Sequence, residues 1–200
     1  MVYKISPYGR EDSCFGDSII IDDFPNMPDN KQLVHRDHSP SVKKSNLSII
    51  ANDMSSPLNV GSLFRLCDAL GLYKLYLCGN TATLPNSKIN KTSRSTEKYV
   101  DYEYYENAEQ LINKLKTEDT FIISLEITST SIAIDSAIFQ NLLKPKAPTC
   151  LILGSENTGI NKTLLSLSDV TTHIPMHGKN SSMNVISAAS IACYEIIQNL

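Results

Sequence analysis

The sequence predicts an α/β domain with a mostly parallel sheet and helices on both faces. Short apolar runs such as LSIIAN (47–52) and TCLILG (149–154) are typical of strands. Between such runs lie segments in which apolar residues recur at helical spacing, as in 57–70. Strands that alternate with helices favour parallel pairing, and parallel sheets are covered on both faces.

The expected elements follow one another from residue 47 to the end of the sequence. Strands are predicted at 47–52, 74–79, 98–102, 120–128, 149–154 and 170–175. Helices are predicted at 57–70, 108–116, 161–167 and 183–200. Gly71 directly follows the first helical segment and is a candidate C-cap.

The first 45 residues differ from the rest. They hold four of the 9 prolines and a single β-like run, SIIID at 18–22. We therefore expect a partly ordered N-terminal extension at 1–45 and one domain at 46–200.

Composition excludes some classes of protein. With 42% hydrophobic residues the chain can bury a core, so disorder throughout is excluded. A net charge of −3 argues against a uniformly positive surface, although a local basic patch can still bind nucleic acid. No apolar run reaches about 18 residues, and Lys4, Pro7 and Arg10 interrupt any signal-peptide pattern. We expect a cytoplasmic protein.

The 5 cysteines do not have metal-ligand spacing. They contain no CxxC pair. Besides Cys14, four of them lie in apolar segments: Cys67, Cys78, Cys150 and Cys193. Buried free thiols are therefore a better interpretation than zinc ligands. His35 and His38 have no second ligand pair and are interpreted as loop residues, so no metal is predicted.

A first motif is NVGSLFRLCDALGL at 59–72. Leu63, Leu66 and Leu70 recur at helical spacing, so this face of the helix is expected to pack on the sheet. Arg65 lies on a different side of the same helix. It is either an ordinary solvent-facing arginine or a functional residue.

A second motif, LILGSENTGI at 151–160, places a glycine loop after a strand. Gly154 and Gly159 have P-loop spacing, but Ile160 and Asn161 stand where Lys and Ser or Thr are needed. Ligands of open α/β sheets bind at the carboxyl ends of strands, so this loop and the loop after THIPM (172–176) are the default site. Glu156 is either a base or a carboxylate that ties loop amides together.

A third motif is IPMHGKNSSMNVISAA at 174–189. Four polar residues precede its helix, although an N-cap needs only one: Asn180, Ser181, Ser182 and Asn184. Behind them lies a narrow face of small apolar residues: Val185, Ala188, Ala189, Ala192 and Ile196. Such a face lets a helix and a sheet, or two helices of a dimer, approach closely.

In this order the three motifs resemble those of the SpoU (TrmH-like) RNA ribose 2′-O-methyltransferases of the SPOUT superfamily. The matching residues are Asn59, Gly61, Arg65, Gly154, Glu156, Gly159, Ile174, Pro175, Met176, Gly178, Ser182, Met183, Asn184 and Val185. The resemblance covers roughly 47–200. Two departures are mild: Met183 stands where Leu is usual, and Ile186 where Ser is usual. Met183 would line the cofactor pocket and could loosen its fit.

The resemblance implies a fold, a cofactor and a reaction. It implies a deep C-terminal trefoil knot (the SPOUT fold) that binds bent S-adenosyl-L-methionine, a homodimer, and methyl transfer to a ribose 2′-hydroxyl of RNA. Transfer RNA is favoured because the domain is compact. The alternatives are ribosomal RNA as substrate, or an inactive RNA-binding relative.

The resemblance also implies the roles of individual residues. Catalytic roles would fall to Arg65, Asn59, Glu156, Ser182 and Asn184, and cofactor contacts to Leu125, Gly154, Ile174, Met176 and Met183. The family's arginine withdraws the hydroxyl proton, yet a guanidinium has a pKa of about 12.5 or more and is almost never neutral at pH 7. Stabilisation of a developing alkoxide is therefore favoured over action as a base. Glu156 would brace the glycine loop of the second motif.

A local basic segment lies at 87–98. It carries four basic residues against one acid, Glu97: Lys88, Lys91, Arg94 and Lys98. The segment is either a solvated loop or helix face, or the surface that binds RNA phosphates.

Overall fold

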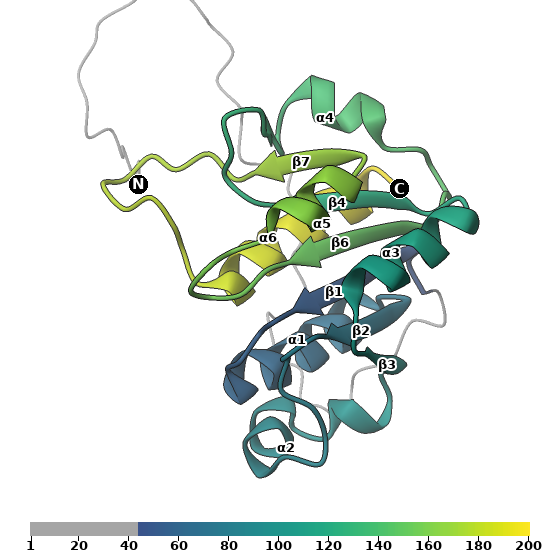
Figure 1. Cartoon of the computed structure of the whole chain (residues 1–200), viewed down its shortest axis with the longest axis vertical. Coiled ribbons are helices and arrows are strands. Elements are labelled where there is room, and N and C mark those ends of the chain that lie inside the picture. Colours follow the sequence, from purple (N-terminus) through teal and green to yellow (C-terminus); the bar gives the residue numbers. More distant parts are fainter. Residues whose placement is uncertain (1–43) are drawn as a thin grey trace, which may run out of the picture. The chain divides into compact units, whose positions relative to one another are not determined.

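Seven parallel strands form one sheet in the order β3-β2-β1-β6-β4-β7-β5 (Figure 1). The computed structural model describes residues 44–200, so the expectations for SIIID, Cys14, His35 and His38 lie outside the described residues. The strands are β1 (Leu47–Asn52), β2 (Lys74–Cys78), β3 (Tyr102–Tyr105), β4 (Phe121–Leu125), β5 (Ile132–Ala133), β6 (Thr149–Leu153) and β7 (Val170–His173). The predicted parallel sheet is confirmed. The trefoil knot stays a prediction, because strand order alone does not establish how the chain is threaded.

Helices cover both faces of the sheet. They are α1 (Pro57–Leu70), α2 (Ser87–Ser93), α3 (Ala108–Thr117), α4 (Ala137–Leu142), α5 (Lys162–Leu167) and α6 (Val185–Gln198), with a 3₁₀ turn, η3, at Thr96–Lys98. In β1, Ile49 and Ala51 pack in the core on the α1 and α6 side, whereas Ile50 packs with α3 and α5 (Figure 1). This alternation follows from the two-residue period of a strand, and it explains why the strands are apolar throughout.

Helix α1 has the bounds and ends that the sequence predicts. Ser56 caps its N-terminus by accepting a hydrogen bond from the Asn59 amide, and Pro57 begins the first turn. Gly71 ends it in the left-handed conformation, with φ 59°. Leu63 is fully buried, whereas Arg65 is exposed to solvent.

The strand predicted at 98–102 is wrong. Arg94 and Ser95 both have positive φ, 54° and 75°, and turn the chain into η3. Strand β3 begins only at Tyr102, at the edge of the sheet, where most of its side chains are exposed. An edge strand with solvated side chains has no apolar run, so the sequence pattern misplaces it.

Helix α4, with 6 residues, and strand β5, with 2, were not predicted, because so few residues show little periodicity. Within the basic segment, 7 residues form helix α2, and both interpretations of its charges stay open.

Helix α6 begins two residues later than predicted. Asn184 is its N-cap, with non-helical ψ of 136°, and its Oδ1 accepts hydrogen bonds from the amides of Ile186 and Ser187. The small-residue face packs within the chain, because Ala189 and Ala192 are fully buried in the core. Within one copy of the chain, this face therefore packs against the sheet and α1, and the dimer stays a prediction.

Four cysteines in the described part of the chain are buried free thiols, as predicted: Cys67, Cys78, Cys150 and Cys193. Burial raises the pKa of the Cys78 thiol to about 12, with a smaller effect from Asp53, so it is protonated at neutral pH. Within residues 44–200 no three His, Cys, Asp or Glu side chains are grouped so that they could hold a metal ion. No helix in the same range is both long and apolar enough to cross a membrane.

Candidate functional site

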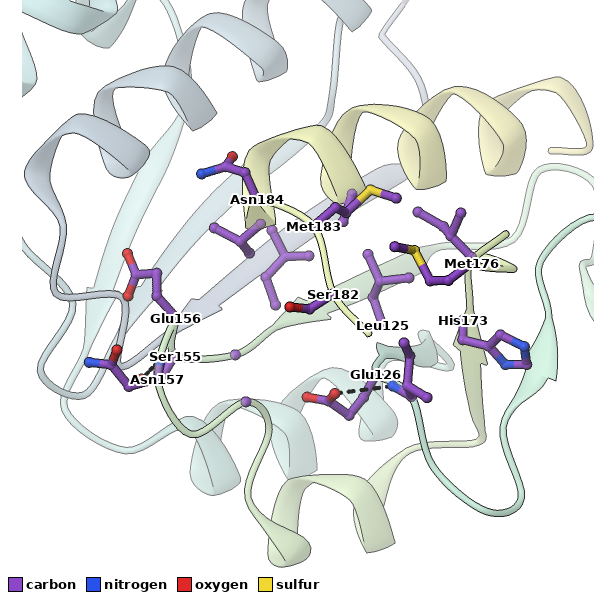
Figure 2. Close-up of a pocket in the computed structure, with 17 residues that line it drawn as sticks. Leu125, Glu126, Ser155, Glu156, Asn157, His173, Met176, Ser182, Met183 and Asn184 are labelled. Carbon is purple, nitrogen blue, oxygen red and sulfur yellow. Dashed lines mark hydrogen bonds between the residues drawn. The ribbon is translucent and has the colours of Figure 1, made fainter. Parts of the chain in front are cut away.

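A pocket of about 400 Å³ opens at the carboxyl ends of β4, β6 and β7 (Figure 2). The loops that follow these three strands form its walls, together with the start of α6. All the residues expected to contact a cofactor line it: Leu125, Gly154, Ile174, Met176 and Met183. Its volume lies within the roughly 300–1,000 Å³ usual for small-molecule sites.

The glycine loop after β6 is closed by its own backbone. Ser155 and Gly159 exchange two backbone hydrogen bonds, of 3.1 and 2.9 Å. A Cβ atom on Gly154 would overlap the backbone of Gly159 and Ile160, and Gly159 itself has φ 65°. Both glycines are therefore required for this turn, which leaves backbone atoms as its surface toward the pocket.

Glu126 holds this loop in place, although the sequence did not identify it. Its Oε2 accepts a hydrogen bond from the Ile160 amide at 2.9 Å, and its Oε1 accepts one from the Ile127 amide at 3.0 Å. A side chain on Gly159 would overlap the Glu126 carboxylate. The signal was a lone acid among apolar residues at the end of a strand. The sequence did not reveal this role, because Glu126 was predicted to lie inside a strand that runs to 128, whereas β4 ends at Leu125.

Glu156 binds a different segment from the one expected. Its carboxylate points away from the pocket interior (Figure 2) and accepts hydrogen bonds from the amides of Ser55 and Ser56, each at 3.3 Å. It also accepts a hydrogen bond of 2.8 Å from Asn59 Nδ2. Glu156 thus fastens its own loop to the N-terminus of α1, a partner that the sequence did not indicate.

The environment of Glu156 favours its charged form. Partial burial works against the charge, but the hydrogen bonds from Asn59 and from backbone amides outweigh that effect and lower the pKa of the carboxyl. At neutral pH Glu156 is therefore an ionised acceptor. This geometry favours the loop-tying alternative over the alternative of a base.

The third motif supplies the other wall of the pocket. Ser182, Met183 and Asn184 all line it (Figure 2). Met183 is 37% exposed. Asn184 also caps α6, so its amide oxygen is already used. Further lining residues that the sequence did not single out are Ile127, Leu153, Ser155, Asn157 and His173.

Arg65 lies apart from the pocket. It lines a separate groove between α1 and α6, beside Ile186 and Ser190. The structure thus joins Asn59 to Glu156 and places Ser182 and Asn184 at the pocket, but one copy of the chain does not bring Arg65 to its lining.

The predicted phosphate-binding residues project from a surface beyond α1. Lys88, Lys91, Arg94 and Lys98 are all exposed, on or next to α2 and η3. Helix α2 packs tightly on α1 at Gly61, where a Cβ would lie 2.8 Å from the Ile89 carbonyl oxygen. A hydrogen bond from Ser93 lowers the pKa of Glu97, so the one acid of this segment is held in place and charged.

The fold and the pocket define an α/β protein that binds a small molecule at the carboxyl edge of a parallel sheet. Comparison with known families then gives a more specific result. The model of the SpoU rRNA Methylase family matches residues 46–194, and the chain belongs to this family. The resemblance drawn from the three motifs is confirmed.

Relatives agree with this assignment. The chain is 26% identical over 153 residues to a tRNA (guanosine(18)-2′-O)-methyltransferase of Thermus thermophilus, covering 76% of this chain and 75% of the relative. It is 29% identical over 154 residues to the enzyme of the same name from Aquifex aeolicus, covering 76% and 69%. The crystal structure of the SpoU methyltransferase AviRb from Streptomyces viridochromogenes with AdoMet aligns with a TM-score of 0.67 at 23% identity, covering 78% of this chain and 61% of that chain. This last likeness confirms the fold.

Proposed function

We propose that this protein transfers a methyl group from S-adenosyl-L-methionine to a ribose 2′-hydroxyl of RNA, with transfer RNA as the favoured substrate. The observation that carries the proposal is the hydrogen bond of 2.8 Å between Asn59 and Glu156. It joins the first motif to the second, at a pocket whose other wall is the third motif. Family membership and the two tRNA methyltransferase relatives support the reaction and the substrate.

The pocket fits the proposed cofactor. Backbone atoms at Gly154, which has no side chain of its own to cover them, would bind its polar groups. Leu125, Ile174 and Met183 provide apolar wall next to this backbone. When bound, S-adenosylmethionine supplies an electrophilic methyl group.

Positioning is the main task of the protein's own residues, because a methyl transfer of this kind requires the acceptor oxygen in line with the breaking bond. Asn59 and Ser182 would place the ribose, and Asn184 would hold the third motif while capping α6. Arg65 would orient the phosphate and stabilise the developing alkoxide rather than act as a base.

A homodimer would complete this arrangement. Arg65 does not line the pocket of its own chain, whereas it is exposed in a groove beside α6. The outer face of α6 carries two exposed apolar residues, Ile191 at 46% and Tyr194 at 60%. A second copy docked on this face would shield them and could present its Arg65 to the first copy's pocket.

The choice of RNA rests on the relatives that are tRNA methyltransferases, whereas the family description names rRNA. The test is to incubate the protein with S-adenosylmethionine labelled in the methyl group and with unmodified tRNA or rRNA transcripts. We expect label in tRNA first. Label in rRNA alone would show that the substrate is ribosomal RNA, the alternative to transfer RNA. Cofactor binding without transfer to any RNA would support the inactive relative.

A further inference from the structure

A second cavity, of about 410 Å³, is lined by residues next in the chain to the two loops that Glu156 ties together, among them Asp53 and Asn161. It opens at the carboxyl ends of β1, β2 and β3, beside the first turns of α3 and α5. Asn161 lies in its lining and directly follows Ile160, the residue whose amide Glu126 binds at the cofactor pocket. One short loop therefore separates the two cavities along the chain.

Two amide donors are held in fixed orientations in this cavity. Asn107 Oδ1 caps α3 by accepting hydrogen bonds from the amides of Glu109 and Gln110. Asn161 Oδ1 caps α5 by accepting one of 2.9 Å from the Leu164 amide. Because each oxygen is used by its helix, each Nδ2 group remains available to donate to a ligand.

A largely buried residue in the lining of the same cavity supplies an acceptor. Asn52 is 5% exposed and lines it, and its Nδ2 donates to Asp53 at 2.8 Å. Its Oδ1 accepts no hydrogen bond from any residue in the described range. Every buried side-chain oxygen and nitrogen in that range has a hydrogen-bond partner. The Asn52 Oδ1 atom is therefore not buried, and it is open to the cavity. Although Asn52 as a residue is largely buried, its Oδ1 is therefore accessible to a ligand.

The charges and the aromatic surface narrow the class of ligand. Glu106 and Glu109 line the cavity, and neither forms a salt bridge with a described residue. Lysine and arginine are absent from its lining within the described residues, so a phosphate would meet only negative charge.

Tyr104 is 51% exposed, and its hydroxyl donates to the Gly79 carbonyl at 3.0 Å, which fixes the ring. A ring held at the rim is a surface on which a base can stack.

We propose that this cavity binds a nucleobase with an exocyclic amino group, from a nucleotide near the methylated one. The carboxylates would accept from ring N–H and amino groups, Asn107 and Asn161 would donate to ring acceptors, and Tyr104 would stack. Guanine suits the set best, since its Watson–Crick edge presents two neighbouring donors and one acceptor. This inference rests on the proposed function for its RNA, but the binding of a base can be tested without methyl transfer.

The direct test uses the full chain with guanosine, adenosine, cytidine and uridine 5′-monophosphates, observed by ligand-detected NMR. We expect GMP to bind most tightly and UMP, which has no exocyclic amino group, most weakly. The double variant N107S/N161S keeps both caps, because serine caps helices about as well as asparagine, but it loses the amide donors. GMP binding should weaken about tenfold in it. The matched control N86S, at the α2 cap outside the cavity, should bind GMP as the wild type does.

The kinetic test separates base recognition from chemistry. Y104L should raise the KM for RNA about tenfold while kcat and S-adenosylmethionine affinity stay unchanged, because the base then has no aromatic ring on which to stack. Y73L is the matched control, since Tyr73 is 55% exposed and lies outside the cavity.

Equal binding of all four nucleotides, or GMP binding unchanged in N107S/N161S, would overturn the inference. A wild type that binds GMP selectively but methylates no RNA would overturn the proposed function and leave this cavity's role standing.

Discussion

Asn59 and Glu156 are 97 residues apart in the sequence and are joined by a hydrogen bond of 2.8 Å. The same carboxylate accepts the amides of Ser55 and Ser56. One side chain therefore links the segment before α1 to the glycine loop at the pocket, and its carboxylate points away from the pocket interior (Figure 2).

This link predicts a coupled loss in E156A. Without the carboxylate, Asn59 and the two serine amides lose their common acceptor, so both loops lose their alignment. We expect kcat/KM to fall at least tenfold, which is about 1.4 kcal/mol of transition-state stabilisation. E156Q keeps one acceptor oxygen and should lose less. Equal activity of E156A and wild type would show that the link is dispensable.

The lowered pKa of Glu156 gives this contact a pH dependence. A carboxyl whose folded pKa lies below the usual 4.5 stabilises the fold fully above that pH and loses its contribution as the pH falls through the folded value. Acidification below about pH 4.5 should therefore destabilise wild type more than E156Q. Thermal unfolding of both proteins between pH 3 and pH 7 measures this. Parallel curves over that range would contradict the assignment.

Gly154→Ala should abolish cofactor binding. The added Cβ would overlap the Gly159 backbone, so the loop cannot keep the turn that exposes its backbone to the pocket. We expect the Kd for S-adenosylmethionine, measured by calorimetry, to rise by a hundredfold or more. Gly178→Ala is the matched control, because a Cβ there meets nothing within 4 Å. Retained affinity in Gly154→Ala would mean that the cofactor binds elsewhere.

Arg65→Ala should lose turnover and keep cofactor affinity, since Arg65 lies outside the pocket lining. If the site is shared between two copies, mixing Arg65→Ala with Gly154→Ala protein should restore activity. Each mixed dimer would then have one site with an intact pocket and an intact Arg65. More than a tenth of wild-type kcat/KM in Arg65→Ala alone would contradict its role. An active monomer in sedimentation at micromolar concentration would contradict the dimer.

The exposed basic residues of α2 predict a salt dependence of RNA binding. Changing Lys88, Lys91 and Arg94 together to Ala should weaken binding strongly and reduce the salt slope by roughly one unit for each phosphate that is no longer neutralised. All three are solvent-exposed, so the fold and S-adenosylmethionine affinity should stay intact. An unchanged slope would place the RNA elsewhere, with the segment around Lys43 and Lys44 as the next candidate.

The sequence predicted those elements and features that depend on residues close together in the chain. Helix α1 was predicted to the residue because Pro57 and Gly71 mark its ends and leucines mark its buried face. Gly154 was identified as a site residue because a glycine directly after a buried strand indicates close backbone approach. The five residues predicted to contact a cofactor line one pocket, and four of them come together because parallel strands end at the same edge of a sheet.

Other features depend on partners far away in the sequence, and these were missed. Glu126 and the amide of Ile160 are 34 residues apart, so no local pattern pairs them. The partners of Glu156 lie 97 to 101 residues away and could not be assigned for the same reason. The separation of Arg65 from the pocket depends on how α1 and α6 pack, which residue spacing does not determine.

The nature of the labelled product tests the central claim most directly. RNA methylated by this protein with labelled S-adenosylmethionine would be digested completely with alkali, which needs a free 2′-hydroxyl to cleave the neighbouring phosphodiester. A 2′-O-methyl group blocks that cleavage, so we predict that the label is recovered in alkali-stable dinucleotides and is absent when Arg65→Ala replaces the wild type. Label recovered in mononucleotides would place the methyl group on a base and contradict ribose 2′-O-methylation.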